Sequence, residues 1–91
     1  MEGYKLRQIR SLKDLEETNY GWILDSYPFD EIKGGFVDEA YSSGKFNPED
    51  MEQVEIPLII IVHGRLYIEP AKAYVENGEY YIGHEEFESH F

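Results

Sequence analysis

Hydrophobic and polar positions divide the chain into a first half with helical spacing and a second half that alternates as strands do. Residues 4–10 alternate weakly and predict a short strand. Ser11 and Asp14 match an acidic version of the capping box, which predicts a helix over about residues 12–19. Residues 22–24 then predict either a short strand or a last turn.

Prolines and glycines mark further short helices in the first half. Pro28 suits the first turn of a helix that the glycine pair at residues 34–35 stops, because proline fixes φ and glycine adopts positive φ at little cost. Residues 36–41 predict one more turn. Asn47 has the features of an N-cap, followed by a proline and two acids, and predicts a helix over about residues 48–53.

From Val54 onward the pattern is that of strands. Residues 58–62 form a run of mostly β-branched side chains, residues 63–65 offer a tight turn, and residues 66–75 supply the partner strand. The pair Asn77-Gly78 is the strongest hairpin signal in the chain and leads into a strand over residues 80–82. The last nine residues predict one more helical turn.

These elements predict a single α+β domain over residues 1–91: an antiparallel meander sheet of three to four strands, with short helices mainly in the N-terminal half. Pro57 and Pro70 lack an amide donor, so we expect them near strand ends, edges or bulges. Because side chains alternate across a strand, the apolar run 58–62 requires cover on both faces. Either helices cover both sides of the sheet or a second copy of the chain covers one, so a homodimer is one expectation.

Charge divides the chain differently. The sequence has 19 Asp and Glu against 8 Lys and Arg, a formal net charge of −11. Residues 1–13 hold four of the bases and one acid, a net charge of +3, whereas residues 14–91 carry −14. Charge of this size bears on partners and solubility rather than on fold. It disfavours contact with anionic lipid and with nucleic acid, so membrane binding is not expected, and direct DNA or RNA binding is not expected unless the basic N-terminal segment provides it.

Composition narrows the class of protein further. The chain is 42% hydrophobic and 15% aromatic, which excludes a disordered acidic tail. It has no cysteine, so disulfides, thiolate metal sites and cysteine nucleophiles are excluded, and a reducing compartment suits it. The longest apolar run is far below the roughly 18 residues of a membrane helix, and the first ten residues lack a signal-peptide pattern. A cytoplasmic protein is expected.

Motifs for catalysis are weak. His84 and Glu88 are four residues apart and would share a helix face, and His90 follows, but the segment is not HExxH and a catalytic zinc normally has three protein ligands. The serines lack a motif that supplies a base or an oxyanion hole, and no glycine-rich phosphate loop is present. We therefore predict a non-enzymatic protein without a cofactor. A metal-dependent enzyme built on these three residues is a further hypothesis.

Regularly spaced carboxylates can imitate the phosphates of DNA. Neighbouring acids on one strand or helix face stand about 5 to 7 Å apart, a spacing that resembles that of phosphates. The alternative is that these acids only solvate the surface. Eight tyrosines, five phenylalanines and one tryptophan favour a recognition surface. The candidate partner-binding residues are Asp14, Glu16, Glu17, Asp30, Glu31, Asp38, Glu39, Glu49, Asp50, Glu52, Glu55, Glu76, Glu79, Tyr81, Glu85, Glu86 and Glu88.

The leading hypothesis is a non-enzymatic acidic inhibitor that occupies the basic groove of a nucleic-acid-binding protein or nuclease, as DNA-mimic proteins do. Such proteins are often encoded by phages and mobile elements and block restriction enzymes or CRISPR effectors. The alternative is an immunity or antitoxin-type protein that masks a toxin's active site through aromatic and acidic contacts. In that case alanine at Trp22 or Tyr81 should dominate the loss of binding, whereas a charge mimic should weaken gradually as acids are neutralised.

Overall fold

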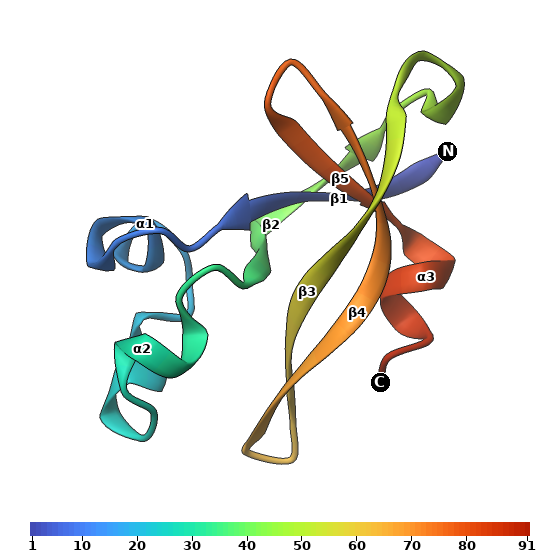
Figure 1. The fold of residues 1–91 in the computed structure, drawn as a ribbon. Coiled ribbons are helices and arrows are strands. Elements are labelled where there is room, and N and C mark those ends of the chain that lie inside the picture. Colours follow the sequence, from blue (N-terminus) through green and yellow to red (C-terminus); the bar gives the residue numbers. More distant parts are fainter.

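The computed structural model is a closed barrel of five strands with short helices outside it (Figure 1). The strands are β1 (Glu2–Gln8), β2 (Phe36–Lys45), β3 (Glu52–Val62), β4 (Arg65–Glu76) and β5 (Glu79–Gly83). The α-helices are α1 (Leu12–Glu16), α2 (Phe29–Ile32) and α3 (His84–Glu88), and the 3₁₀ helices are η1 (Gly21–Asp25) and η2 (Pro48–Asp50). The structure describes the backbone throughout and the side chains of residues 1–39 and 44–91.

The predicted open antiparallel meander of three to four strands is wrong. The meander exists as β3–β4–β5, but β1 pairs antiparallel with β5 on one side and with β2 on the other. β2 then meets β3 in parallel, through the described pair Phe36 and Leu58, which closes a mixed barrel. The turn predicted over residues 36–41 is therefore part of a strand, because pairing along β1 outweighs the weak strand preference of its acidic and small residues.

Gly3 allows β1 to approach β5 closely enough for closure. A Cβ atom at this position would lie 2.0 Å from the carbonyl oxygen of Ile82, a backbone atom of β5. Gly3→Ala is therefore expected to destabilise the protein by about 1 to 3 kcal/mol, as overpacked sites do. The matched control is Gly44→Ala, because Gly44 pairs with Gly3 from β2 and its added Cβ would meet no described atom within 4 Å. Equal urea midpoints for the two variants would contradict this account of closure.

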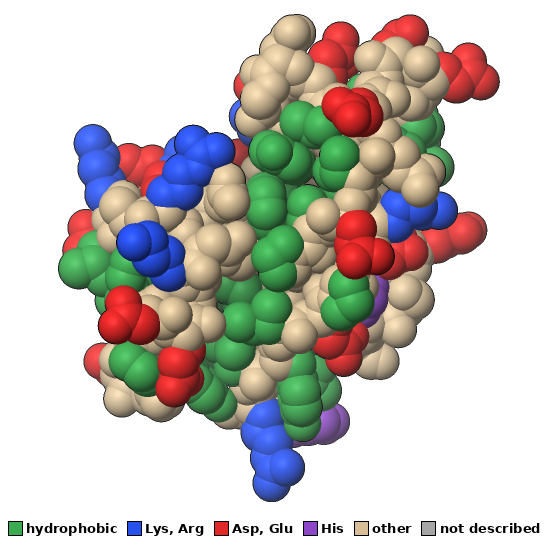
Figure 2. Space-filling view, in the orientation of Figure 1, with side chains coloured by type: hydrophobic (Ala, Val, Ile, Leu, Met, Phe, Trp, Pro, Cys, Tyr) green, Lys and Arg blue, Asp and Glu red, His purple; other side chains and the backbone are tan. Residues whose placement is uncertain are grey.

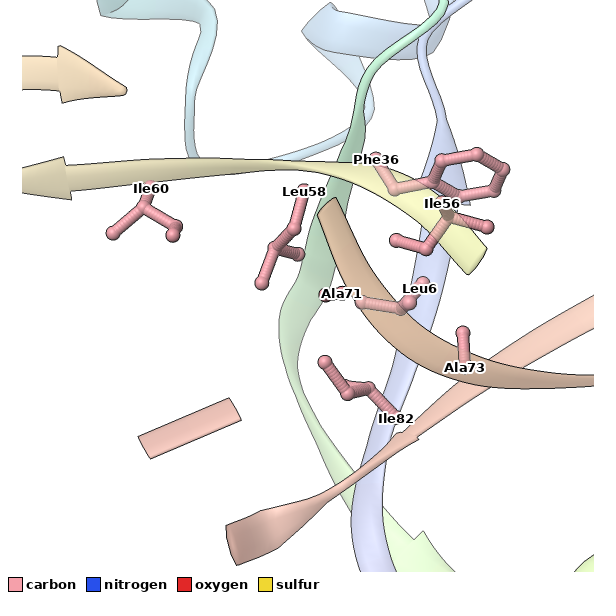
Figure 3. Packing of buried hydrophobic residues seen from close by; sticks show 8 residues of the cluster. All are labelled: Leu6, Phe36, Ile56, Leu58, Ile60, Ala71, Ala73 and Ile82. Carbon is pink, nitrogen blue, oxygen red and sulfur yellow. The ribbon is translucent and has the colours of Figure 1, made fainter. Parts of the chain in front are cut away.

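Within its apolar run, residues 58–62, β3 is covered on both faces, as that run predicted. Leu58 and Ile60 point into the barrel, where Figure 3 shows them with Leu6, Phe36, Ile56, Ala71, Ala73 and Ile82. Ile59 lies on the other face and packs in a cluster with Val37 of β2 and with residues of the segment that joins β1 to β2, namely Ile9, Leu15, Ile23 and Ile32. A single chain therefore covers both faces of β3 along this run. The homodimer stays a prediction, but this strand does not require it.

Turns and caps follow the local sequence signals. Ser11 and Asp14 form the reciprocal capping box of α1. The hairpin turns at residues 63–64 and 77–78 have positive φ at both positions, 51° and 74° in the first and 52° and 78° in the second. Two-residue hairpins of type I′ require this backbone, which glycine and asparagine adopt most easily.

The helices are shorter than predicted. α1 and η2 end at Glu16 and Asp50, before the predicted ends near Asn19 and Gln53. Residues 22–24 belong to η1, so they form a turn and not a strand. The predicted helical turn at the end of the chain is α3, whose Phe87 packs against the barrel core. No helix in the described part of the chain is long and apolar enough to cross a membrane.

Candidate functional site

Two of the four bases in residues 1–13, Lys5 and Arg7, lie in β1 and pair with acids of the barrel and of the segment after α1. Nζ of Lys5 is 3.5 Å from Oε1 of Glu79 and 3.9 Å from Oε2 of Glu39. Arg7 pairs with Glu17 and, through Nε at 3.6 Å, with Glu39. Partly exposed ion pairs of this kind contribute little stability. Their main effect is electrostatic, because they neutralise part of the predicted acidic surface within the chain.

Two further predicted acids have structural partners. Asp14 accepts hydrogen bonds from the backbone N–H of Arg10 at 2.9 Å and of Ser11 at 3.0 Å. The hydrogen bond from Arg10 is the main cause that lowers the pKa of the Asp14 carboxyl. Asp38 accepts a hydrogen bond from the hydroxyl of Tyr20. Both carboxylates are therefore held in place by the fold and are poorly placed for a partner.

His90 ties the end of the chain to β4. Its Nδ1 is 2.7 Å from Glu69 and its Nε2 is 3.0 Å from Glu86, and the side chain is 13% exposed. A carboxylate at each ring nitrogen favours the imidazolium, and the bond to Glu69 is the main cause that raises the pKa of His90. The bond to His90 in turn lowers the pKa of Glu86, which also accepts the N–H of Lys72 at 3.2 Å. Glu86 therefore anchors α3.

The three residues of the metal hypothesis do not converge. His84 and Glu88 share a face of α3, as their spacing predicted, with Nε2 3.2 Å from Oε1. His90 is occupied by Glu69 and Glu86 instead. Among the side chains that the structure describes, no group of three or more His, Asp or Glu could hold a metal ion.

The remaining predicted acids are exposed and have no ion pair within 4 Å in the described part of the chain. They are Glu16, Asp30, Glu31, Glu49, Asp50, Glu52, Glu55, Glu76 and Glu85. Five of them, Glu49, Asp50, Glu52, Glu55 and Glu76, come from η2, the start of β3 and the end of β4. We call these five the acidic end. Figure 2 shows carboxylates gathered at the top of the view, where Figure 1 places the η2 turn and the β4–β5 hairpin.

A hollow of about 320 Å³ lies at the acidic end. The rings of Phe46 and Tyr81 are stacked beside it, with centroids 5.3 Å apart and planes 28° apart. The hydroxyl of Tyr81 donates a hydrogen bond to Glu79 at 3.2 Å. The pKa of Tyr81 is raised, mainly because the hydroxyl is partly buried and also because of this hydrogen bond. The lining residues are Lys45, Phe46, Asn47, Asp50, Met51, Glu76, Asn77, Glu79 and Tyr81. The hollow thus combines carboxylates with aromatic rings, a combination that suits a cationic group.

The sequence pointed to Asp50, Glu76 and Tyr81 but not to Phe46. Tyr80 and Tyr81 lie on opposite faces of β5, as adjacent strand residues should: Tyr80 packs on the barrel core and Tyr81 on Phe46. Phe46 follows β2 and reaches Tyr81 and Tyr74 across β1, where Gly3 leaves room for its ring: a Cβ atom at Gly3 would lie 2.7 Å from Cε1 of Phe46. The sequence around Phe46 contains no local pattern that predicts its contact with Tyr81.

No protein-family model, curated protein or solved structure matches this chain at a significant level. The acidic end and the hollow are therefore the features that bear on function.

Proposed function

We propose that this protein is a non-enzymatic inhibitor whose acidic end occupies the basic nucleic-acid-binding groove of a partner protein, in the manner of a DNA mimic. The observation that carries the proposal is the grouping, at one end of the barrel, of five exposed carboxylates that form no described ion pair, although Lys45 lines the same hollow as Asp50 and Glu76. A carboxylate that is already paired within the chain attracts a partner weakly. Unpaired ones act on a basic surface over a Debye length of about 8 Å in physiological salt.

The proposal uses fewer residues than the sequence suggested. Asp14, Glu17 and Glu39 are left out because their carboxylates have ion pairs within the chain, and Asp38 because it is half-buried beside the hydroxyl of Tyr20. Asp50 accepts a hydrogen bond from Nδ2 of Asn47 at 3.1 Å but is exposed and has no ion pair, so it is kept. Glu79, Glu86 and Glu88 are left out because they too have ion pairs within the chain, and Tyr81 is uncharged. The remaining unpaired acids, Glu16, Asp30, Glu31 and Glu85, lie on the helices α1, α2 and α3 and serve as controls.

The hollow favours a second candidate function, an immunity or antitoxin-type protein. A lysine or arginine side chain of a toxin would meet the faces of Phe46 and Tyr81 and the carboxylates of Asp50 and Glu76. In such a complex a few contacts carry most of the binding energy. Trp22 is the other aromatic candidate, because its side chain is 53% exposed.

Neutralising the acidic end is expected to lower the association rate with a partner by about 10-fold or more in low salt, because steering by opposite charge is lost. The variant is E49Q/D50N/E52Q/E76Q. Its matched control, E16Q/D30N/E31Q/E85Q, removes the same number of unpaired, exposed charges elsewhere and is expected to lower the rate by about threefold or less. Biolayer interferometry would measure both against a purified restriction enzyme, CRISPR effector, repair glycosylase and nucleoid protein.

Salt and DNA provide the second readout. Binding is expected to weaken between about 50 mM and about 500 mM salt as the Debye length falls, and duplex DNA should compete. Equal losses for the two quadruple variants, or no binding to any of the four classes, would contradict the proposal. If Tyr81→Ala or Trp22→Ala abolished binding while E49Q/E52Q, which leaves Asp50 and Glu76 of the hollow in place, bound normally, the immunity-type function would replace it.

We further propose a cytoplasmic location. The support is the absence of cysteine from the sequence, which suits a reducing compartment, and the need to meet a nucleic-acid-binding partner. Recovery of the tagged chain outside the cytoplasmic fraction of its host would overturn this.

A further inference from the structure

The long strands β3 and β4 direct alternate backbone amides away from each other. In an antiparallel pair, residues opposite one another either exchange both hydrogen bonds or direct both N–H groups outward. Lys72 donates its N–H to Glu86, outside the ladder, so its register partner Glu55 also directs its N–H outward. The same alternation makes Gln53 and Pro57 outward positions.

The outer edge of β4 is protected along most of its length. The N–H of Leu66 donates to the hydroxyl of Tyr27 at 3.1 Å, and that of Lys72 donates to Glu86. Pro70 has no N–H, so its edge position fits the prediction from the sequence. Only Ile68 among these outward positions has an amide without a described partner, and one isolated donor cannot template a strand. From Tyr74 onward β5 pairs with this edge.

The outer edge of β3 lacks comparable protection between Gln53 and Pro57, a segment that we call the open edge. β2 meets β3 at Leu58, and no described strand pairs with residues 53–57 on this side. Gln53 and Glu55 are exposed, and in the described part of the chain their outward N–H groups have no hydrogen-bond partner. The outward N–H groups of Gln53 and Glu55 are two residues apart, and so are their carbonyl groups. This is the spacing at which an added strand forms hydrogen bonds with a sheet edge.

We propose that the open edge binds an extended basic segment of a partner as an added strand. Glu55 lies on the edge itself and Glu52 at the start of the same strand, after Glu49 and Asp50 of η2. A second copy of this chain would bring the same acids against one another, which disfavours self-association here. The basic character of the segment rests on the proposed function, whereas the availability of the edge rests on the backbone alone.

Glu55→Pro removes the outward N–H of Glu55 and leaves the β3–β4 ladder intact, because Pro57 already occupies an equivalent outward position opposite Pro70. The control Glu55→Gln removes the same charge and keeps the N–H. The probe is a short fluorescein-labelled peptide that alternates valine and arginine, titrated by fluorescence anisotropy. We expect E55P to bind about 10-fold more weakly than wild type, and E55Q about two- to threefold more weakly.

Amide hydrogen exchange of the wild-type protein tests the same edge without a substitution. The amides of Gln53 and Glu55 should exchange fast in the free protein and slowly with the peptide bound. Protection of both amides in the free protein, or equal binding by E55P and E55Q, would overturn the open edge. A neutral valine–threonine peptide that bound as tightly and protected the same amides would leave the edge standing and overturn the basic partner, and with it the proposed function.

Discussion

Replacing Ile59 with alanine is expected to destabilise the protein by about 2 to 5 kcal/mol, as much as the same replacement of Ile60. The two residues are neighbours on β3 but belong to different clusters. Ile60 is 1% exposed inside the barrel, and Ile59 is 6% exposed beneath the segment that joins β1 to β2. In a sheet with one wet face, one of two adjacent positions would tolerate alanine. Here each truncation leaves a cavity.

The control for this pair is Ile68→Ala. Ile68 is the register partner of Ile59 but is 43% exposed, so its truncation should cost about 1 kcal/mol or less. Urea unfolding followed by circular dichroism would measure all three variants. The loss of stability in Ile59→Ala should equal that in Ile60→Ala. If it were as small as the loss in Ile68→Ala, the helical segment would not be packed on β3 as described.

The second large effect is the pH dependence that His90 gives to stability. Its pKa lies above the ordinary 6.5, so the contribution of its imidazolium is complete below pH 6.5 and is lost as the pH rises through the raised pKa. The pKa of Glu86 lies below its ordinary 4.5, so its contribution is complete above pH 4.5 and is lost as the pH falls through the lowered pKa. The anchor of α3 is therefore strongest between these two pH values.

His90→Gln is expected to lower the free energy of unfolding by about 1.5 to 3 kcal/mol at pH near 6, the range for hydrogen bonds to charged groups. The difference between wild type and variant should shrink at alkaline pH, where His90 is neutral in both states. His84→Gln is the control, because the His84–Glu88 pair is exposed and should contribute less than about 1 kcal/mol. A difference that stayed constant from pH 6 to alkaline pH would exclude a protonated His90 from the anchor.

The sequence predicted those parts of the fold whose causes are local. The capping box at Ser11 and the hairpin turn at residues 77–78 depend on backbone angles and hydrogen bonds within a few residues. Closure of the barrel depends on β1 meeting β5 and on the close approach at Gly3, which only the folded chain brings about. The weak strand preference of residues 36–45 concealed β2 for the same reason.

The candidate site was predicted in outline and not in detail. Counting acids identified Asp50 and Glu76, but it could not separate paired from unpaired carboxylates, because that depends on where Lys5 and Arg7 lie in space. The division into a basic leader and an acidic domain does not persist in the fold. β1 carries Lys5 and Arg7 to acids elsewhere in the fold, and five of the nine predicted acids that stay exposed without a described ion pair lie at the acidic end.

The central claim is that the acidic end is the binding surface, and a hydrogen-exchange footprint of a complex tests it most directly. The complex would use whichever of the four nucleic-acid-binding proteins binds in a salt-sensitive manner with DNA as a competitor. We predict that the partner slows amide exchange in η2, the first residues of β3 and the β4–β5 hairpin, and leaves α1 and α2 unchanged. Slowed exchange over α2 or α3, with η2 and the hairpin unchanged, would contradict the claim.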